Sequence, residues 1–409
     1  MTQPSTPPST PPSAPPSAPP SRRTAVGLLG AFALASEYVD ELVLGTVRDV
    51  HGAFAKRAFR LTNHATRGSA GFPQALHDGV SRTLYAGIGA GMKAAGAGLR
   101  AAEKRGIGPR LEAGPGGRQV LSAVNGLIGD RLVDEWPEFA IPMAARLHGS
   151  DVPLDHANLA AAYPQATGDL VVFLHGLGEN DDSWNRRREE NGGTYGSRLA
   201  EQTSWTPVYL RANTGLPIAE NGVALAALLD DLVAGWPTEV RRISLVGHSM
   251  GGLIIRAACA VVTDAETPWA SLVTNVVTLG SPHLGAPLEH TVNFGARALG
   301  ILPESAPFGR ILEYRSVGIL NLRRGLAADV QHLPHARYHL VAATLNGSHR
   351  HPVSEAFGDL FVRYPSAVGR PRRGRAMFPD ADVLHVPGTD HFGLLNHPGV
   401  YTAMQGWLA

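Results

Sequence analysis

The hexapeptide Gly247-His248-Ser249-Met250-Gly251-Gly252 constrains this chain more than any other stretch. It stands between a strand-like apolar run, 243–246, and a helix-like apolar run, 253–262. A Gly-x-Ser-x-Gly pattern between a strand and a helix is typical of a nucleophile elbow, a sharp turn that holds the serine in a strained backbone conformation. The flanking glycines leave room for neighbouring chain. The pattern predicts that Ser249 is a catalytic nucleophile, exposed at the carboxyl edge of a sheet.

Short apolar runs alternate with helical runs from residue 137 to the end of the chain. Residues 169–174 form a continuous run of the kind found in strands buried on both faces of a sheet. The other predicted strands are 140–147, 207–211, 243–246, 276–279, 338–345 and 383–386. Helical runs such as 223–232 and 253–262 lie between them. The alternation predicts an α/β-hydrolase architecture, a mostly parallel sheet with helices on both faces.

A catalytic serine requires a base to take its proton and a third group to orient that base. In an α/β hydrolase the chain order is serine, acid, histidine, and the histidine follows the last strand. His391 lies in the loop after 383–386, and we predict that it is the base. Two other histidines lie nearby: His397 suits the start of the next helix, and His385 lies within the strand, where packing is expected.

The acid is expected in the loop after the strand 338–345, which offers Glu355 and Asp359. We predict Asp359, because a glycine precedes it and apolar residues follow it, as suits a carboxylate held at a sheet edge. Asp382 and Asp390 stay open as alternatives, with a solvated surface role as the competing interpretation of both. Asp390 directly adjoins His391, so its side chain is expected to point away.

Hydrolysis of an acyl compound passes through a tetrahedral oxyanion that fixed N–H donors stabilise. One donor is expected from the residue after the nucleophile, which is Met250. The second is expected from the loop after the first buried strand, where His175-Gly176-Leu177-Gly178 follows Leu174. We predict the backbone N–H groups of Leu177 and Met250 as the oxyanion hole.

Together with the elbow, four further stretches make the chain, over about residues 140–409, similar to the lipase and esterase branch of the α/β-hydrolase superfamily. These are Phe173-Leu174-His175-Gly176-Leu177, Asn213-Thr214-Gly215 with Asn221-Gly222, Thr278-Leu279-Gly280-Ser281-Pro282-His283-Leu284-Gly285, and His391-Phe392-Gly393-Leu394-Leu395. More narrowly, the chain resembles bacterial lipase-like proteins related to the PGAP1-like group, the glycolipid inositol deacylases. The resemblance implies ester hydrolysis through an acyl-serine, with Ser249, Asp359 and His391 as a catalytic triad. The resemblance does not imply that this chain shares the substrate of the inositol deacylases.

The remaining segments suggest three parts. Residues 1–21 are rich in Pro and Ser and cannot bury a core, so we expect a disordered arm. Residues 22–136 show helical apolar patterns, one of them marked by Leu121, Val124, Ile128 and Leu132, and are predicted to form a helical subdomain. Residues 137–409 are the predicted catalytic domain. Its apolar insertion at about 287–336 is either a mobile lid or a packed excursion, and His283 just before it is expected to be structural.

Two features bear on where the protein works. Arg22-Arg23 and the apolar run 25–35, which ends in Ala33-Leu34-Ala35, are typical of a twin-arginine export signal. The apolar pattern continues beyond that segment, however, which favours an amphipathic helix. The longest uncharged apolar stretches are shorter than the roughly 20 residues that cross a bilayer. We therefore expect a cytoplasmic or peripherally membrane-associated protein, with export as the alternative.

Composition excludes several classes of function. Lys plus Arg number 36 and acidic residues 35, so no basic field exists to hold a nucleic acid. The one cysteine, Cys259, permits neither a disulfide nor a zinc framework. No cofactor or metal is expected. The N-terminal helices could contact a lipid surface, and the oligomeric state is not predicted.

The sequence thus predicts a serine carboxylic-ester hydrolase that acts on an apolar acyl ester. A thioesterase or acyltransferase would use the same triad, because only the fate of the acyl-enzyme differs. Outside enzymes, the alternative is a lipid-surface binding protein whose triad is idle.

Overall fold

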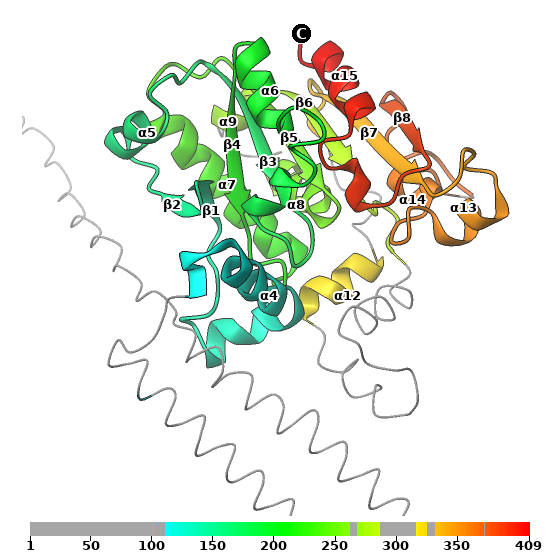
Figure 1. Cartoon of the computed structure of the whole chain (residues 1–409), viewed down its shortest axis with the longest axis horizontal. Coiled ribbons are helices and arrows are strands. Elements are labelled where there is room, and N and C mark those ends of the chain that lie inside the picture. The colour runs from blue at the N-terminus through cyan, green and yellow to red at the C-terminus, as the bar shows by residue number, and fades with distance from the viewer. Residues whose placement is uncertain (1–100, 102–110, 262–267, 287–315, 325–331, 372) are drawn as a thin grey trace, which may run out of the picture.

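The computed structural model describes residues 101, 111–261, 268–286, 316–324, 332–371 and 373–409, which are coloured in Figure 1. The predicted arm 1–21, the twin-arginine segment and the helical patterns up to residue 100 lie outside the described residues. Most of the predicted insertion 287–336 also lies outside them. The predictions for these segments, including the division into domains, stay predictions.

One eight-stranded sheet forms the centre of the described chain, with the strand order β2-β1-β4-β3-β5-β6-β7-β8 (Figure 1). Its strands are β1 (Ala144–Leu147), β2 (Ser150–Val152), β3 (Asp169–Leu174), β4 (Trp205–Arg211), β5 (Arg242–His248), β6 (Val273–Leu279), β7 (Arg337–Thr344) and β8 (Asp382–Pro387). β1 is antiparallel to β2 and β4, and the pairings from β4 to β8 are parallel. The predicted α/β-hydrolase architecture, a mostly parallel sheet, is confirmed.

The predicted strands agree closely with the observed ones, because long apolar runs bounded by polar residues leave little choice of structure. The run 169–174 is β3 with both ends as predicted, and all six residues are buried. The leading strand is shorter than predicted, since β1 begins at Ala144. The short strand β2 was not predicted, because its sequence Ser-Asp-Val carries no apolar alternation.

Helices connect the strands and cover both faces of the sheet. Those described are η2 (Leu111–Ala113), α4 (Pro115–Glu135), α5 (His156–Ala162), η3 (Asp181–Asn185), α6 (Tyr195–Gln202), α7 (Ile218–Gly235), α8 (Met250–Val261), α9 (Pro268–Leu272), α12 (Val317–Arg324), α13 (Pro352–Phe357), α14 (Tyr364–Ala367), η4 (Phe392–Leu394) and α15 (Pro398–Trp407). The predicted helical runs 223–232 and 253–262 correspond to α7 and α8.

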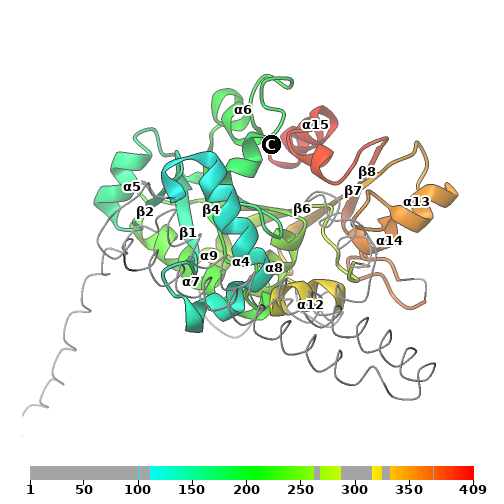
Figure 2. The ribbon, with the colours of Figure 1, turned by 60° about the horizontal axis from the view of Figure 1, so that its bottom comes forward.

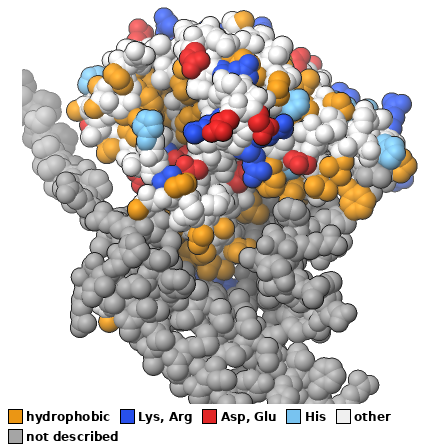
Figure 3. Space-filling model, viewed as in Figure 1, with side chains coloured by type: hydrophobic (Ala, Val, Ile, Leu, Met, Phe, Trp, Pro, Cys, Tyr) orange, Lys and Arg blue, Asp and Glu red, His pale blue; other side chains and the backbone are white. Residues whose placement is uncertain are grey.

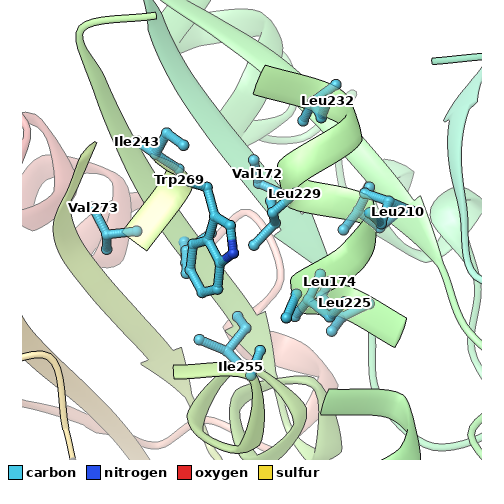
Figure 4. Packing of buried hydrophobic residues seen from close by; sticks show 14 of the residues in the cluster. Val172, Leu174, Leu210, Leu225, Leu229, Leu232, Ile243, Ile255, Trp269 and Val273 are labelled. Atoms are coloured by element: carbon cyan, nitrogen blue, oxygen red, sulfur yellow. The ribbon is translucent and has the colours of Figure 1, made fainter. Parts of the chain in front are cut away.

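Alternate residues of β3 build two separate cores, because successive side chains of a strand point to opposite faces. Leu170, Val172 and Leu174 pack in the core that α7, α8 and α9 complete. Figure 4 shows Trp269 of α9 at the centre of this cluster. Val171 and Phe173 pack in the other core, with α6 and α15. Figure 2 shows α6 and α15 on one side of the sheet and α7 and α9 on the other. This double cover fixes the carboxyl ends of the parallel strands, where the predicted site lies.

Helix α4 packs against loops at that same end of the sheet. Its small residues permit a close approach: a Cβ built on Gly126 would lie 2.9 Å from Cα of Gly178. On its other side it contacts the start of α12, where Ser316 Oγ donates to the carbonyl of Gly126 at 2.8 Å. Figure 2 shows α4 and α12 side by side. The predicted helical pattern at Leu121 to Leu132 therefore belongs to a helix that lies on the sheet's loops.

In the part of the chain that the structure describes, no helix combines the length and the apolar character that crossing a membrane requires. The face of the molecule in Figure 3 shows acidic and basic side chains interspersed, as the nearly balanced composition implies.

Candidate active site

Ser249 lies in the sharp turn between β5 and α8, where the Gly-x-Ser-x-Gly pattern places it. Its φ angle is 52°, in the left-handed region that costs a residue with a side chain about 1–3 kcal/mol. The Ser249 N–H donates to the carbonyl of Leu279 at the end of β6, at 2.8 Å. The residue is buried, with 8% of its surface exposed, so the prediction of an exposed serine is wrong. The strained backbone therefore keeps Ser249 at the carboxyl edge of the sheet.

Two glycines of the elbow are needed for close approach of backbone to backbone. A Cβ at Gly247 would lie 2.5 Å from the amide nitrogen of Gly252, which belongs to the first turn of α8. A Cβ at Gly251 would collide with the carbonyl oxygens of Leu174 and His175, at the end of β3. The turn can pack this tightly against β3 only without side chains at these positions.

His391 and Asp359 come together from the loops after β8 and β7. Nδ1 of His391 lies 2.8 Å from Oδ2 of Asp359, and both side chains are buried. The other carboxylate oxygen of Asp359, Oδ1, accepts the N–H groups of Phe361 at 3.0 Å and Val362 at 2.8 Å. Burial by itself lowers the pKa of His391, but the charge and hydrogen bond of Asp359 outweigh it, and the pKa is raised above its ordinary value.

The alternatives that the sequence left open lie elsewhere. Glu355, Asp382 and Asp390 are all exposed. Asp382 pairs with His339 at 3.0 Å, and Asp390 accepts the N–H of Gly393 at 2.6 Å. The two other histidines have local partners, since His385 bonds Thr344 and His397 caps α15 by accepting the N–H of Gly399. Of the four carboxylates considered, Asp359 is the one in contact with His391.

Ser249 and His391 approach neighbouring residues at the end of β6. Leu279, the last residue of β6, accepts the Ser249 N–H, and a Cβ built on the next residue, Gly280, would lie 3.1 Å from Cε1 and Nδ1 of His391. Among the described residues no hydrogen bond involves the Ser249 hydroxyl. The structure thus brings His391 to Asp359 and places the pair beside the elbow, without a serine–histidine hydrogen bond.

In the loop after β3, the N–H of Leu177 lacks an acceptor in the described chain, whereas the N–H groups on either side of it are hydrogen-bonded. The N–H of Gly176 donates to Oε2 of Glu179 at 2.7 Å, and the N–H of Gly178 donates to Oγ1 of Thr214 at 2.9 Å. Among the described residues the N–H of Leu177 has no acceptor, and neither has that of Met250 at the start of α8. Free N–H groups at the first turn of a helix favour negative charge. Both residues predicted as oxyanion donors therefore have N–H groups available.

A buried pair at this site was not predicted from the sequence. Oε2 of Glu179 lies 2.8 Å from Nδ1 of His248, the residue just before the nucleophile. Their only sequence signal is position, since Glu179 follows the His-Gly-x-Gly turn and His248 lies inside the elbow. A Glu in a turn ordinarily indicates solvent exposure, so the sequence does not mark it as part of the site.

His175 also lies beneath the loop, and its contacts define its role. Its Nδ1 donates to the carbonyl of Gly176 at 2.9 Å, and its Nε2 accepts the N–H of Ala212 at 3.0 Å. Burial lowers the pKa of His175, which keeps the ring neutral, as this donor–acceptor pattern requires. His175 therefore links the ends of β3 and β4.

Helix α4 braces the outer side of the same loop. Gln119 Nε2 donates to the carbonyl of Gly178 at 3.0 Å, and Arg118 Nε donates to Asp182 at 2.7 Å. At the neighbouring loop after β4, Asn213 Nδ2 donates to the carbonyl of Gly129 at 3.0 Å. The position of the predicted oxyanion loop thus depends on a helix that precedes the sheet in sequence.

His283, predicted to be structural, is buried and bonds to Thr278 at 3.2 Å. Burial, followed by the charge of Arg256, holds its pKa well below the ordinary value. Within the described ranges no three His, Cys, Asp or Glu side chains gather in a metal-binding arrangement.

Comparison with known proteins gives matches of three kinds. Residues 164–311 match the family model described as "Putative serine esterase (DUF676)". A triacylglycerol lipase from Burkholderia plantarii is 28% identical over 161 residues. The match takes in 37% of this chain and 39% of that lipase, so the chain spans well under half the length of this relative.

Among solved structures, the chain is similar to a lipase-esterase related protein from Clostridium acetobutylicum, with 12% identity and a TM-score of 0.36. That likeness covers 59% of this chain and 96% of the other. It is also similar to an esterase from Pyrococcus furiosus, with 14% identity, a TM-score of 0.37, and coverage of 60% and 84%.

Proposed function

We propose that the protein is a serine carboxylic-ester hydrolase that works through an acyl-serine. Its α/β-hydrolase sheet and the match of residues 164–311 to a family described as putative serine esterases support this proposal. One observation carries the proposal. The hydrogen-bonded pair of Asp359 and His391 lies beside the strained elbow of Ser249, where two backbone N–H groups are unused.

In the proposed reaction Ser249 Oγ attacks the ester carbonyl carbon and its proton passes to Nε2 of His391. Because Asp359 engages Nδ1, Nε2 is the nitrogen left to act as the base. Asp359 then stabilises the imidazolium. The N–H groups of Leu177 and Met250 donate to the oxyanion that forms on the former carbonyl oxygen. The oxyanion collapses, the alcohol leaves with the proton of His391, and water releases the acid from Ser249 by the same steps.

We further propose that the acyl group of the substrate is apolar. Aromatic rings surround the base: the ring centroid of Phe361 lies 5.3 Å, and that of Phe392 5.6 Å, from the imidazole of His391. The donor residue Leu177 is itself a partly buried apolar side chain. The lipase to which the chain is similar acts, by its name, on triacylglycerols, and this supports an acyl ester as the substrate class.

The test is labelling of the purified full chain with a fluorophosphonate, followed by hydrolysis of p-nitrophenyl esters of increasing acyl length. We expect one labelled peptide, containing Ser249, and kcat/KM that rises with chain length. Ser249→Ala is the control and abolishes labelling without loss of the fold. Labelling that persists in that variant, or a wild-type protein that reacts with neither reagent, contradicts the proposal. Adding an alcohol or a thiol acceptor shows whether the acyl group goes to water or is transferred.

A further inference from the structure

A second carboxylate and imidazole pair lies next to Asp359 and His391. Glu179 follows the loop after β3, and His248 ends β5, immediately before Ser249. Both residues are buried, with 7% and 1% exposure. The ring of His248 stands 4.8 Å, centroid to centroid, from the ring of His391. The proposed reaction gives neither residue a role.

Each ring nitrogen of His248 has a partner of its own. Nδ1 lies 2.8 Å from Oε2 of Glu179, and Nε2 lies 3.2 Å from the carbonyl oxygen of His391. Burial by itself would raise the pKa of Glu179, but His248 and the N–H of Gly176 lower it to about 2. Glu179 is therefore an ionised acceptor that the His248 ring and the loop after β3 both contact.

We propose that Glu179 and His248 form a positioning pair that holds the oxyanion loop and the loop of the catalytic histidine against the nucleophile elbow. The inference rests on the proposed function. It assigns these residues to the orientation of the reacting groups, without contact to the substrate.

The contacts connect three separate parts of the site. Glu179 accepts the N–H of Gly176, the residue before Leu177. This hydrogen bond holds the loop in the conformation in which the N–H of Leu177 has no acceptor. The same oxygen holds His248, whose backbone continues into Ser249. The far side of the His248 ring holds the backbone of His391. A change in any one of these contacts shifts donor, nucleophile and base relative to one another, and a displacement of about 1 Å can cost about 10²-fold in rate.

Glu179 is not an alternative triad acid. Its carboxylate bonds to His248, whereas Nδ1 of His391 is engaged by Asp359. The charges of Asp359, Glu179 and Asp390 all raise the pKa of His391, in that order of size. The other histidine that faces Glu179 is His175, which burial keeps neutral.

The first test measures the contact between the two side chains without reference to activity. In the full chain labelled with ¹⁵N-histidine, we expect a ring N–H of His248 that exchanges slowly with water, assigned by its loss in His248→Asn. Glu179→Gln replaces the carboxylate by a weaker acceptor, and this N–H should then exchange faster. A ring N–H of His248 that exchanges equally fast in the wild type and in Glu179→Gln overturns the pair, whatever the enzyme does.

The second test measures positioning. We expect Glu179→Gln to lower kcat, and the rate of fluorophosphonate labelling, by about 10²-fold while KM changes little. Asp169→Asn is the matched control, because Asp169 is also a buried carboxylate, bonded to Ser204 and Arg242, but lies at the opposite end of β3. It should lower the melting temperature and leave kcat unchanged. A folded Glu179→Gln variant with wild-type kcat overturns the positioning role. A wild-type protein that fluorophosphonate does not label contradicts the proposed function instead.

Discussion

Asp359 and His391 are joined twice, once through their side chains at 2.8 Å and once through their backbones, where the N–H of His391 donates to the carbonyl of Asp359 at 3.0 Å. The loops after β7 and β8 are therefore held together at two points. The side-chain contact engages Nδ1 of His391 and leaves Nε2 as the nitrogen that the proposed mechanism uses as the base.

Among substitutions of a carboxylate by its amide, Asp359→Asn should lower kcat the most. The amide no longer orients His391 or stabilises its charged form, and loss of a triad acid costs about 10⁴-fold in kcat, or roughly 5 kcal/mol. Steady-state hydrolysis of the p-nitrophenyl esters measures the effect. The exposed carboxylates provide matched controls: Glu355→Gln, Asp382→Asn and Asp390→Asn should each stay within about tenfold. If one of them lost kcat while Asp359→Asn kept it, that residue would be the acid.

The raised pKa of His391 predicts the pH dependence of catalysis. The base must be neutral, and a pKa above the ordinary 6.5 means that protonation begins at higher pH, so kcat/KM should fall as pH drops, with a midpoint above 6.5. The stability of the fold changes with pH in the opposite direction. The stabilisation that His391 contributes is fully present below its pKa in the unfolded chain, and it is lost as pH rises through its pKa in the folded protein. Profiles of kcat/KM and of melting temperature from pH 5 to 9 check both. A kinetic midpoint below 6.5 would contradict the assignment of His391.

Thr214→Val should weaken catalysis without touching a proposed catalytic group. The hydroxyl of Thr214 accepts the N–H of Gly178, the residue after the proposed donor Leu177. The Val variant has no acceptor for the N–H of Gly178, so we expect the loop to shift. We expect kcat to fall by roughly tenfold, equivalent to about 1.4 kcal/mol of transition-state stabilisation. Thr214→Ser keeps the acceptor and should retain activity. Equal activity of the Val and Ser variants would show that this hydrogen bond does not hold the loop.

Gly126→Ala tests whether α4 braces the site. Alanine is the better helix former by about 1 kcal/mol, yet its Cβ would lie 2.9 Å from Cα of Gly178 and 3.0 Å from its nitrogen. We expect a net destabilisation of about 1–3 kcal/mol, measured by urea unfolding, and a lower kcat. Gly116→Ala is the control in the same helix, because a Cβ there meets nothing within 4 Å. It should leave kcat unchanged and not destabilise. If Gly126→Ala left both stability and kcat unchanged, the close packing of α4 against Gly178 would not be needed to hold the site.

The sequence by itself determined the features that depend on neighbouring residues. A nucleophile elbow is a local turn between a strand and a helix, so its six residues predict the strained backbone that Ser249 adopts. β3 was predicted with both ends correct, because an unbroken apolar run must be buried on both faces. The order of elements also placed His391 in the loop after the last strand, since parallel strands bring all their carboxyl ends to one edge.

Only the tertiary structure decided which polar groups meet there. Four carboxylates were compatible with the sequence, and contact with His391 distinguishes Asp359 from the three that are exposed. The pair of Glu179 and His248 is separated by 69 residues, and α4 reaches a loop more than 50 residues further on. Local patterns report periodicity and turns, whereas the state of a charged side chain depends on burial and on partners that distant segments supply. A glutamate in a turn therefore resembles a solvated residue until packing encloses it.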